Sequence, residues 1–68
     1  MKLSARNQLA GTITTVTEGA AIANVEIDVN GQRLVASITL EAARDLGLEE
    51  GKAVTAIIKA SDVIVAAD

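Results

Sequence analysis

The 68-residue chain contains no cysteine, histidine, phenylalanine, tyrosine or tryptophan. Without cysteine there can be no disulfide, and without cysteine or histidine a structural zinc site is nearly excluded. A domain this small removes only about 60% of its unfolded surface from water, so its fold needs reinforcement. Because 50% of the residues are apolar, the remaining way to gain stability is to bury surface between subunits. We therefore expect an obligate homo-oligomer.

Positive charge and long apolar runs are also scarce. The chain has 6 Lys and Arg against 9 Asp and Glu, a formal net charge of −3, which opposes nonspecific binding to nucleic acid. No apolar run approaches the roughly 18 residues of a membrane span, and the N-terminus lacks the apolar core of a signal peptide. The sequence therefore predicts a cytoplasmic protein that binds neither nucleic acid nor membrane. With no proline and no low-complexity stretch, residues 1–68 are expected to form a single domain.

Residue patterns predict three strands in the first half of the chain. Residues 8–17 are rich in Thr, Ile and Val, and Gly11 would permit a bend or bulge. In residues 21–29 apolar and polar side chains alternate, which is typical of a half-buried antiparallel strand. Asn30-Gly31 favours a type I′ turn, and this hairpin would lead into a third strand at residues 32–39.

The apolar period then changes to that of a helix. Thr39 suits an N-cap, residues 40–46 have helical spacing, and Gly47 is a C-terminal stop signal. Two further strands are expected at residues 53–60 and 62–68. Three strands, a short helix and two strands are the order of a five-stranded Greek-key barrel of the OB type, so the predicted fold class is all-β.

The missing residue types also limit the chemistry. A Ser nucleophile with a Lys base, from Ser4 or Ser61 with Lys59, is the one catalytic grouping that the composition leaves open. Since His and Cys are absent, we predict that the protein is not an enzyme and that its side chains coordinate no metal directly. OB barrels that bind single-stranded nucleic acid use stacked aromatic residues in a positive groove, and this chain lacks both features.

Hydrogen-bond donors gather near the start of the chain, at the expected helix start and in a late motif. They are Ser4, Arg6, Asn7, Thr39, Lys59 and Ser61. Two cations, three hydroxyls, an amide and a helix start would together suit a small, doubly charged anion with several oxygens. Each residue also has a plainer explanation, as a cap or as a solvated surface side chain.

A family resemblance links these positions. The segments SARNQLAGTI (residues 4–13), ITLEAARDLGL (residues 38–48) and KASDVIV (residues 59–65) resemble molbindin, or Mop, a small molybdate-binding family. Its module also occurs in the transport-associated OB domains of molybdate importers and regulators. The resemblance covers essentially the whole chain. It implies storage or buffering of molybdate or tungstate, without a cofactor, at subunit interfaces of a hexamer built from dimers.

Transferred by position, the family's oxyanion site implies a particular set of residues here. They are Ser4, Arg6, Asn7, Thr39, Lys59, the Ala60 backbone and Ser61. The resemblance also implies that the N-terminal and late motifs of one site come from neighbouring subunits.

Two hypotheses from other classes stay open at this point. Residues 38–65 resemble the swapped-hairpin regulator domains of the AbrB type, in which a short helix ending in Leu-Gly-Leu precedes an acidic residue, Gly and a strand. That resemblance implies a DNA-binding regulator, although such domains use basic surfaces that are scarce here. The third hypothesis is a purely structural oligomerisation module.

Overall fold

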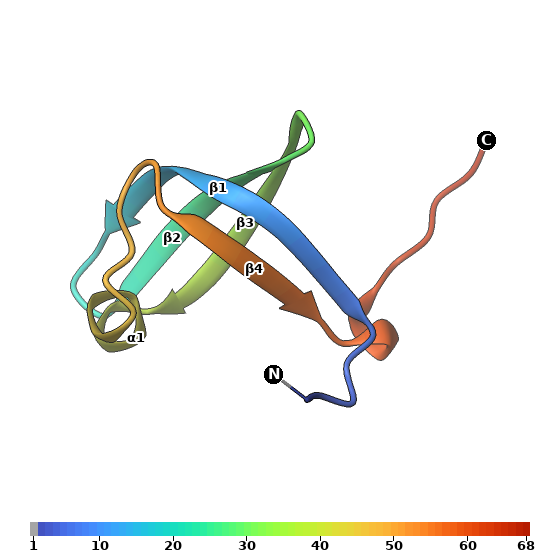
Figure 1. Cartoon of the computed structure of the whole chain (residues 1–68), viewed down its shortest axis with the longest axis horizontal. Helices are drawn as coiled ribbons and strands as arrows, with labels where there is room; N and C mark the ends of the chain where they lie inside the picture. The colour runs from blue at the N-terminus through green and yellow to red at the C-terminus, as the bar shows by residue number, and fades with distance from the viewer. Residues whose placement is uncertain (1) are drawn as a thin grey trace.

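The computed structural model describes residues 2–68. Its elements, in chain order, are β1 (Asn7–Glu18), β2 (Ile22–Val29), β3 (Gln32–Thr39), α1 (Leu40–Asp45), β4 (Ala53–Ile58) and a one-turn 3₁₀ helix, η1 (Ala60–Asp62). The four strands form one antiparallel sheet in the order β3-β2-β1-β4 (Figure 1). Four strands with a short helix between the third and the fourth confirm the first part of the predicted order.

The turn between β2 and β3 has the predicted backbone conformation. Asn30 has a φ of 51° and Gly31 a φ of 84°, and a type I′ turn requires positive φ at both central positions. The two strands pair without a shift from Ile22 opposite Thr39 to Val29 opposite Gln32. The hairpin prediction is confirmed.

The buried core is small. Ile13 is 1% exposed, Val25 is 2% exposed and Ile27 is 6% exposed, and partly buried aliphatic side chains of all four strands pack against them. In β2, Ala23, Val25 and Ile27 are buried and Val29 is half-buried, while the polar residues between them are exposed or half-buried. The alternation predicted for this strand is therefore confirmed.

β1 pairs with β4 in its first half and with β2 in its second half. The bulge that Gly11 was expected to permit lies further along, where the pairing with β2 shifts between Ile13 and Thr15. Gly11 instead allows two strands to approach closely. A Cβ atom there would lie 2.6 Å from Ile27 Cγ2 and 2.7 Å from the Asp28 carbonyl oxygen, so any side chain would force neighbouring atoms to move.

The helix is capped at both ends. Thr39 Oγ1 accepts a hydrogen bond from the Ala42 N–H at 3.1 Å, which confirms the predicted N-cap. The helix ends at Asp45, one residue earlier than expected, and Gly47 follows with a φ of 62°, as a C-terminal glycine should. The Lys52 ammonium group donates to the carbonyl oxygen of Leu46 at 2.6 Å, and so holds the end of the helix.

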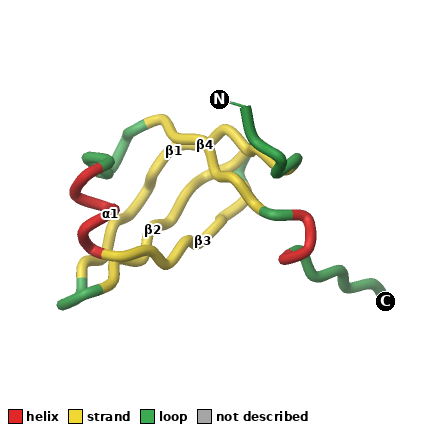
Figure 2. Tube along the Cα trace, turned by 90° about the horizontal axis from the view of Figure 1, so that it is seen from below, coloured by secondary structure: helices red, strands yellow, loops and turns green. Residues whose placement is uncertain are grey.

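The prediction of a fifth strand at residues 62–68 is wrong for the single chain. β4 ends at Ile58, η1 follows, and residues 63–68 form no strand. Figures 1 and 2 show this segment leading away from the sheet. A strand needs a neighbour for its backbone hydrogen bonds, and η1 turns the chain away from both sheet edges. The sheet is consequently not closed into a barrel, and β3 and β4 remain its two edges.

Candidate functional site

The N-terminal and late motifs meet at one end of the sheet. β1 and β4 are antiparallel neighbours, with Asn7 opposite Ile58. Arg6 directly precedes Asn7 and Lys59 directly follows Ile58, so both adjoin the paired ends of the two strands. Figure 1 shows the N-terminal segment and η1 together at this end of the molecule. One chain thus brings Arg6, Asn7 and Lys59 into the same region.

Three of the six cationic side chains have partners elsewhere. Arg33 pairs with a carboxylate of β2, Arg44 pairs with a carboxylate of β1, and Lys52 donates to the end of the helix. Within residues 2–68, neither Arg6 nor Lys59 forms an ion pair or a side-chain hydrogen bond. Both side chains therefore have donors free for an anion.

The remaining donors of the late motif lie on η1. Lys59 is the N-cap of this turn, and its carbonyl oxygen accepts from the Asp62 N–H at 2.9 Å. The first N–H groups of such a turn have no partner within it, so the backbone of Ala60 and the backbone and hydroxyl of Ser61 add neutral donors. Ser4, in the N-terminal segment, is exposed as well.

Thr39 lies away from this cluster. It ends β3 opposite Ile22 and adjoins α1, and the twelve residues of β1 separate that end of the sheet from the end at Asn7. Figure 2 shows α1 and the two terminal segments at opposite sides of the molecule. The plainer explanation of Thr39 as a helix cap is confirmed. While its oxygen accepts from the helix, the hydroxyl group can still donate to another acceptor.

The resemblance implies that the N-terminal and late motifs of one site come from neighbouring subunits. Within one chain, the pairing of β1 with β4 also places the backbones of Arg6 and Lys59 at the same end of the sheet. Thr39 is the predicted site residue that this chain does not bring to Arg6 and Lys59.

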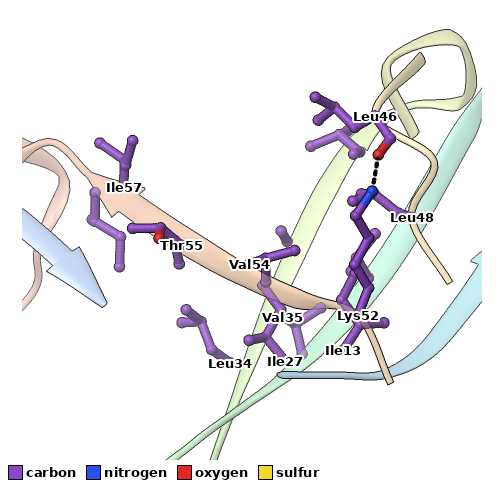
Figure 3. A pocket seen from close by; sticks show the side chains of 15 residues that line it. Ile13, Ile27, Leu34, Val35, Leu46, Leu48, Lys52, Val54, Thr55 and Ile57 are labelled. Atoms are coloured by element: carbon purple, nitrogen blue, oxygen red, sulfur yellow. Dashed lines mark hydrogen bonds between the residues drawn. The ribbon is translucent and has the colours of Figure 1, made fainter. Parts of the chain in front are cut away.

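Sequence reasoning missed an apolar cleft of about 730 Å³ between the two sheet edges. Figure 3 shows side chains of β3 and β4 facing it, with Ile13 and Ile27 among the residues around it. Among the described residues that line it, Lys52 is the charged one. The available signal was the alternation of aliphatic residues in β3 and β4 in a chain with no aromatic side chain to fill the space between them.

Two further arrangements were checked in residues 2–68. No group of three or more His, Cys, Asp or Glu side chains is arranged there to hold a metal ion. None of the helices in the same part of the chain is long and apolar enough to cross a membrane.

Comparisons with known proteins agree over nearly the whole chain. A family model described as the TOBE domain matches residues 3–65. Molybdenum-pterin-binding protein 3 of Clostridium pasteurianum is 40% identical over 68 residues, which cover 98% of this chain and 100% of that protein. A molybdate binding protein from Sporomusa ovata has a similar structure, with a TM-score of 0.95 and 39% identity, covering 98% of this chain and 100% of that one. The cytoplasmic molybdate-binding protein ModG, solved with molybdate bound, is 49% identical with a TM-score of 0.85, covering 88% of this chain and 43% of ModG.

The fold and these relatives define a small binding domain of the non-catalytic kind, which confirms the prediction that the protein is not an enzyme. The chain belongs to the TOBE-domain family, among the molbindin (Mop) proteins. The Mop resemblance is confirmed. The AbrB-type resemblance of residues 38–65 loses its support, because the TOBE model accounts for that segment together with the N-terminal strands.

Proposed function

We propose that the protein binds molybdate or tungstate without changing it chemically, and stores or buffers the oxyanion in the cytoplasm. The observation that carries this proposal is that Arg6 and Lys59, both without carboxylate partners in the described chain, adjoin the paired ends of β1 and β4. Relatives named for molybdate or molybdenum-pterin binding support it. Residues 1–68 act as one domain in this proposal, with no cofactor and no nucleic-acid or membrane partner.

An acidic protein can hold a dianion because near charges outweigh distant ones. Two unit charges about 4 Å apart attract each other by about 1 kcal/mol in water and by about 4 kcal/mol at an effective dielectric constant of about 20. Exposed charges further away than about 8 Å are largely screened at physiological salt. Two cations in contact with the anion therefore dominate over the net charge of −3.

Selectivity follows from a site made of donors. Phosphate is partly protonated at neutral pH, and its own O–H would face donors without an acceptor to receive it. Sulfate carries no proton but is smaller than molybdate, so the size of the closed site has to exclude it. Tungstate shares the charge and shape of molybdate, so we expect the two to bind alike.

We further propose that the complete site lies between subunits of a homo-oligomer, a hexamer built from dimers. Thr39 can reach Arg6 and Lys59 only from a second chain, because it stands at the other end of the sheet. Ser4, Asn7, Ala60 and Ser61 supply the neutral donors in this assignment. The small core also supports assembly, because Leu46 and Ile22 stay 59% and 55% exposed in the single chain.

Calorimetric titration of the protein with molybdate, tungstate, sulfate and phosphate tests the binding proposal. Molybdate and tungstate should bind with closely similar affinities, and sulfate and phosphate should bind much more weakly. An absence of heat with molybdate, or equal affinity for sulfate, would contradict the proposal.

Mixed oligomers test the location of the site. Arg6→Ala chains refolded with Thr39→Ala chains should regain some molybdate sites, because the cations of one chain can meet the intact Thr39 of another. Arg6→Ala chains refolded with Lys59→Ala chains are the matched control. They should regain none, because the two cations come from one chain and every cluster then lacks one of them. Recovery in the control alone would show that the Arg6 and the Lys59 of one site belong to different chains.

A further inference from the structure

The turn between β2 and β3 holds a chemically labile pair of residues. Asn30 and Gly31 are both exposed, and Figure 1 shows this turn at the tip of a hairpin that projects beyond the other strands. A Cβ atom built on Gly31 would find no atom within 4 Å. Within residues 2–68, neither the Asn30 side chain nor the Gly31 N–H takes part in a hydrogen bond. Both groups are therefore free to react and open to water.

Asparagine is a thermolabile residue because the backbone nitrogen that follows it can attack its side chain. The Gly31 nitrogen would lose its proton to hydroxide and form a bond to Cγ of Asn30. The side-chain amide nitrogen would take a proton from water and leave as ammonia, closing a five-membered succinimide ring. Water then adds to one of the two ring carbonyl carbons and opens the ring to aspartate or isoaspartate. The whole sequence consumes water only, and glycine places no side chain in its way.

We propose that Asn30 is a site of spontaneous deamidation, and that the folded hairpin reaches the reactive conformation by a flip of the single peptide group between Asn30 and Gly31. This modification goes beyond the proposed anion binding, because it concerns the hairpin turn and involves neither Arg6 nor Lys59.

The backbone of Asn30 is already half-way to the geometry that ring closure needs. The ring requires Cβ of Asn30 and the nitrogen of Gly31 to lie on the same side of the bond between Cα and the carbonyl carbon. At the first central residue, a type I′ turn has ψ of about +30° and a type II′ turn has ψ of about −120°, and the second value brings these two atoms together. Both turn types have φ of about +60° at that residue, and Asn30 has a φ of 51°. A flip of the next peptide group therefore converts one turn into the other, and glycine accepts the accompanying change in the sign of its φ.

The strands stay paired during this flip. Types I′ and II′ are both favoured two-residue hairpin connections, so Val29 and Gln32, which pair at the end of the hairpin, need not separate. The type II′ turn prefers glycine at the position of Asn30, so the reactive conformer is a minor one. Backbone strain of this kind lowers its population roughly 10- to 100-fold. We expect the folded protein to deamidate more slowly than the unfolded chain by about this factor.

The two products affect the hairpin differently. Aspartate keeps the backbone intact, and Asp-Gly is itself a favoured type I′ pair. Isoaspartate carries the main chain through its side chain and so adds one methylene group to a two-residue loop whose length fixes the strand register. Because β3 is an edge strand that pairs with β2 alone, isoaspartate should loosen it.

Peptide mass spectrometry of the full-length protein, after incubation at mildly alkaline pH, tests the site. Asn24 is a matched control within the same sample, since it is also exposed but lies in β2, pairs on both sides and precedes the β-branched Val25. Conversion of the amide to a carboxyl group should accumulate at Asn30 well before Asn24. Part of the product should resist a protease that cleaves before aspartate, which identifies isoaspartate. Equally slow conversion at Asn30 and Asn24 would overturn the proposal.

The dependence of the rate on urea distinguishes a peptide flip from unfolding. If the flip suffices, the rate at Asn30 should stay level below the unfolding transition and then rise roughly 10- to 100-fold as the chain unfolds. A rate that instead follows the unfolded fraction from the lowest urea concentration would refute the route through the folded hairpin.

Asn30→Asp is the matched control for the effect of the product on stability. It adds the same negative charge as deamidation but leaves the length of the backbone unchanged. It should unfold at nearly the same urea concentration as fresh protein, whereas aged protein enriched in isoaspartate should unfold at a lower one. Equal midpoints for Asn30→Asp and the aged protein would contradict the effect assigned to the added methylene group.

Discussion

Replacing Arg6 or Lys59 by alanine should weaken molybdate binding about 10- to 150-fold. A charge-assisted hydrogen bond contributes about 1.5 to 3 kcal/mol, and about 1.4 kcal/mol corresponds to a factor of ten in Kd. Both side chains are exposed and, within residues 2–68, have no ion-pair partner. Their removal leaves no carboxylate stranded, so circular dichroism should show unchanged secondary structure while calorimetry reports the loss of affinity.

Arg33→Ala is the matched control for this prediction. It makes the same change in net charge, but Arg33 is on β3 and pairs with Glu26. Because charges beyond about 8 Å are screened, its effect on Kd should stay below about twofold. Equal losses in Arg33→Ala and Arg6→Ala would refute the reasoning, since the anion would then respond to overall charge. Full affinity in both Arg6→Ala and Lys59→Ala would place the site elsewhere.

Three stability predictions concern the framework, each measured by urea unfolding at one fixed protein concentration. Gly11→Ala should cost about 1 to 3 kcal/mol, since its Cβ would lie 2.6 Å from Ile27 Cγ2; a neutral result would show that the strands can separate freely. Thr39→Ala should cost about 1 kcal/mol through loss of the N-cap, whereas Thr39→Ser should retain most of it, and equal losses in the two would argue against the cap. Lys52→Ala should cost about 0.5 to 1.5 kcal/mol because its bond to the helix end is lost, and a loss no greater than that of Lys2→Ala would contradict this role.

Features whose partners are adjacent in the sequence could be predicted well. Asn30 and Gly31 form their turn from their own backbone preferences, and Thr39 caps a helix that begins at the next residue. The alternation in β2 also identified its buried face correctly. In each case the physical cause lies within a few residues of the effect.

Features that depend on distant partners could not be predicted. The pattern at Val63 to Val65 indicates a tendency to form a strand, but it carries no information about which edge, or which chain, supplies the neighbour. The grouping of Arg6 with Lys59 depends on the register between β1 and β4, strands that stand at opposite ends of the chain. The apolar cleft results from the missing closure, so a prediction that assumed a closed barrel could not contain it.

Arg6 and Lys59, which have no ion-pair partner within residues 2–68, also affect how fast an anion arrives. Seven of the nine acidic residues lie between positions 18 and 50, and Asp62 on η1 is the one that adjoins the late motif. Arg6 and Lys59 outnumber that carboxylate at their end of the sheet, so this end attracts a dianion. Such a field steers a charged ligand towards one place and raises its association rate, an effect that added salt suppresses. Capture should therefore slow with rising ionic strength more than release does. The protein would then collect a scarce oxyanion most rapidly in dilute salt, as a consequence of where its charges stand.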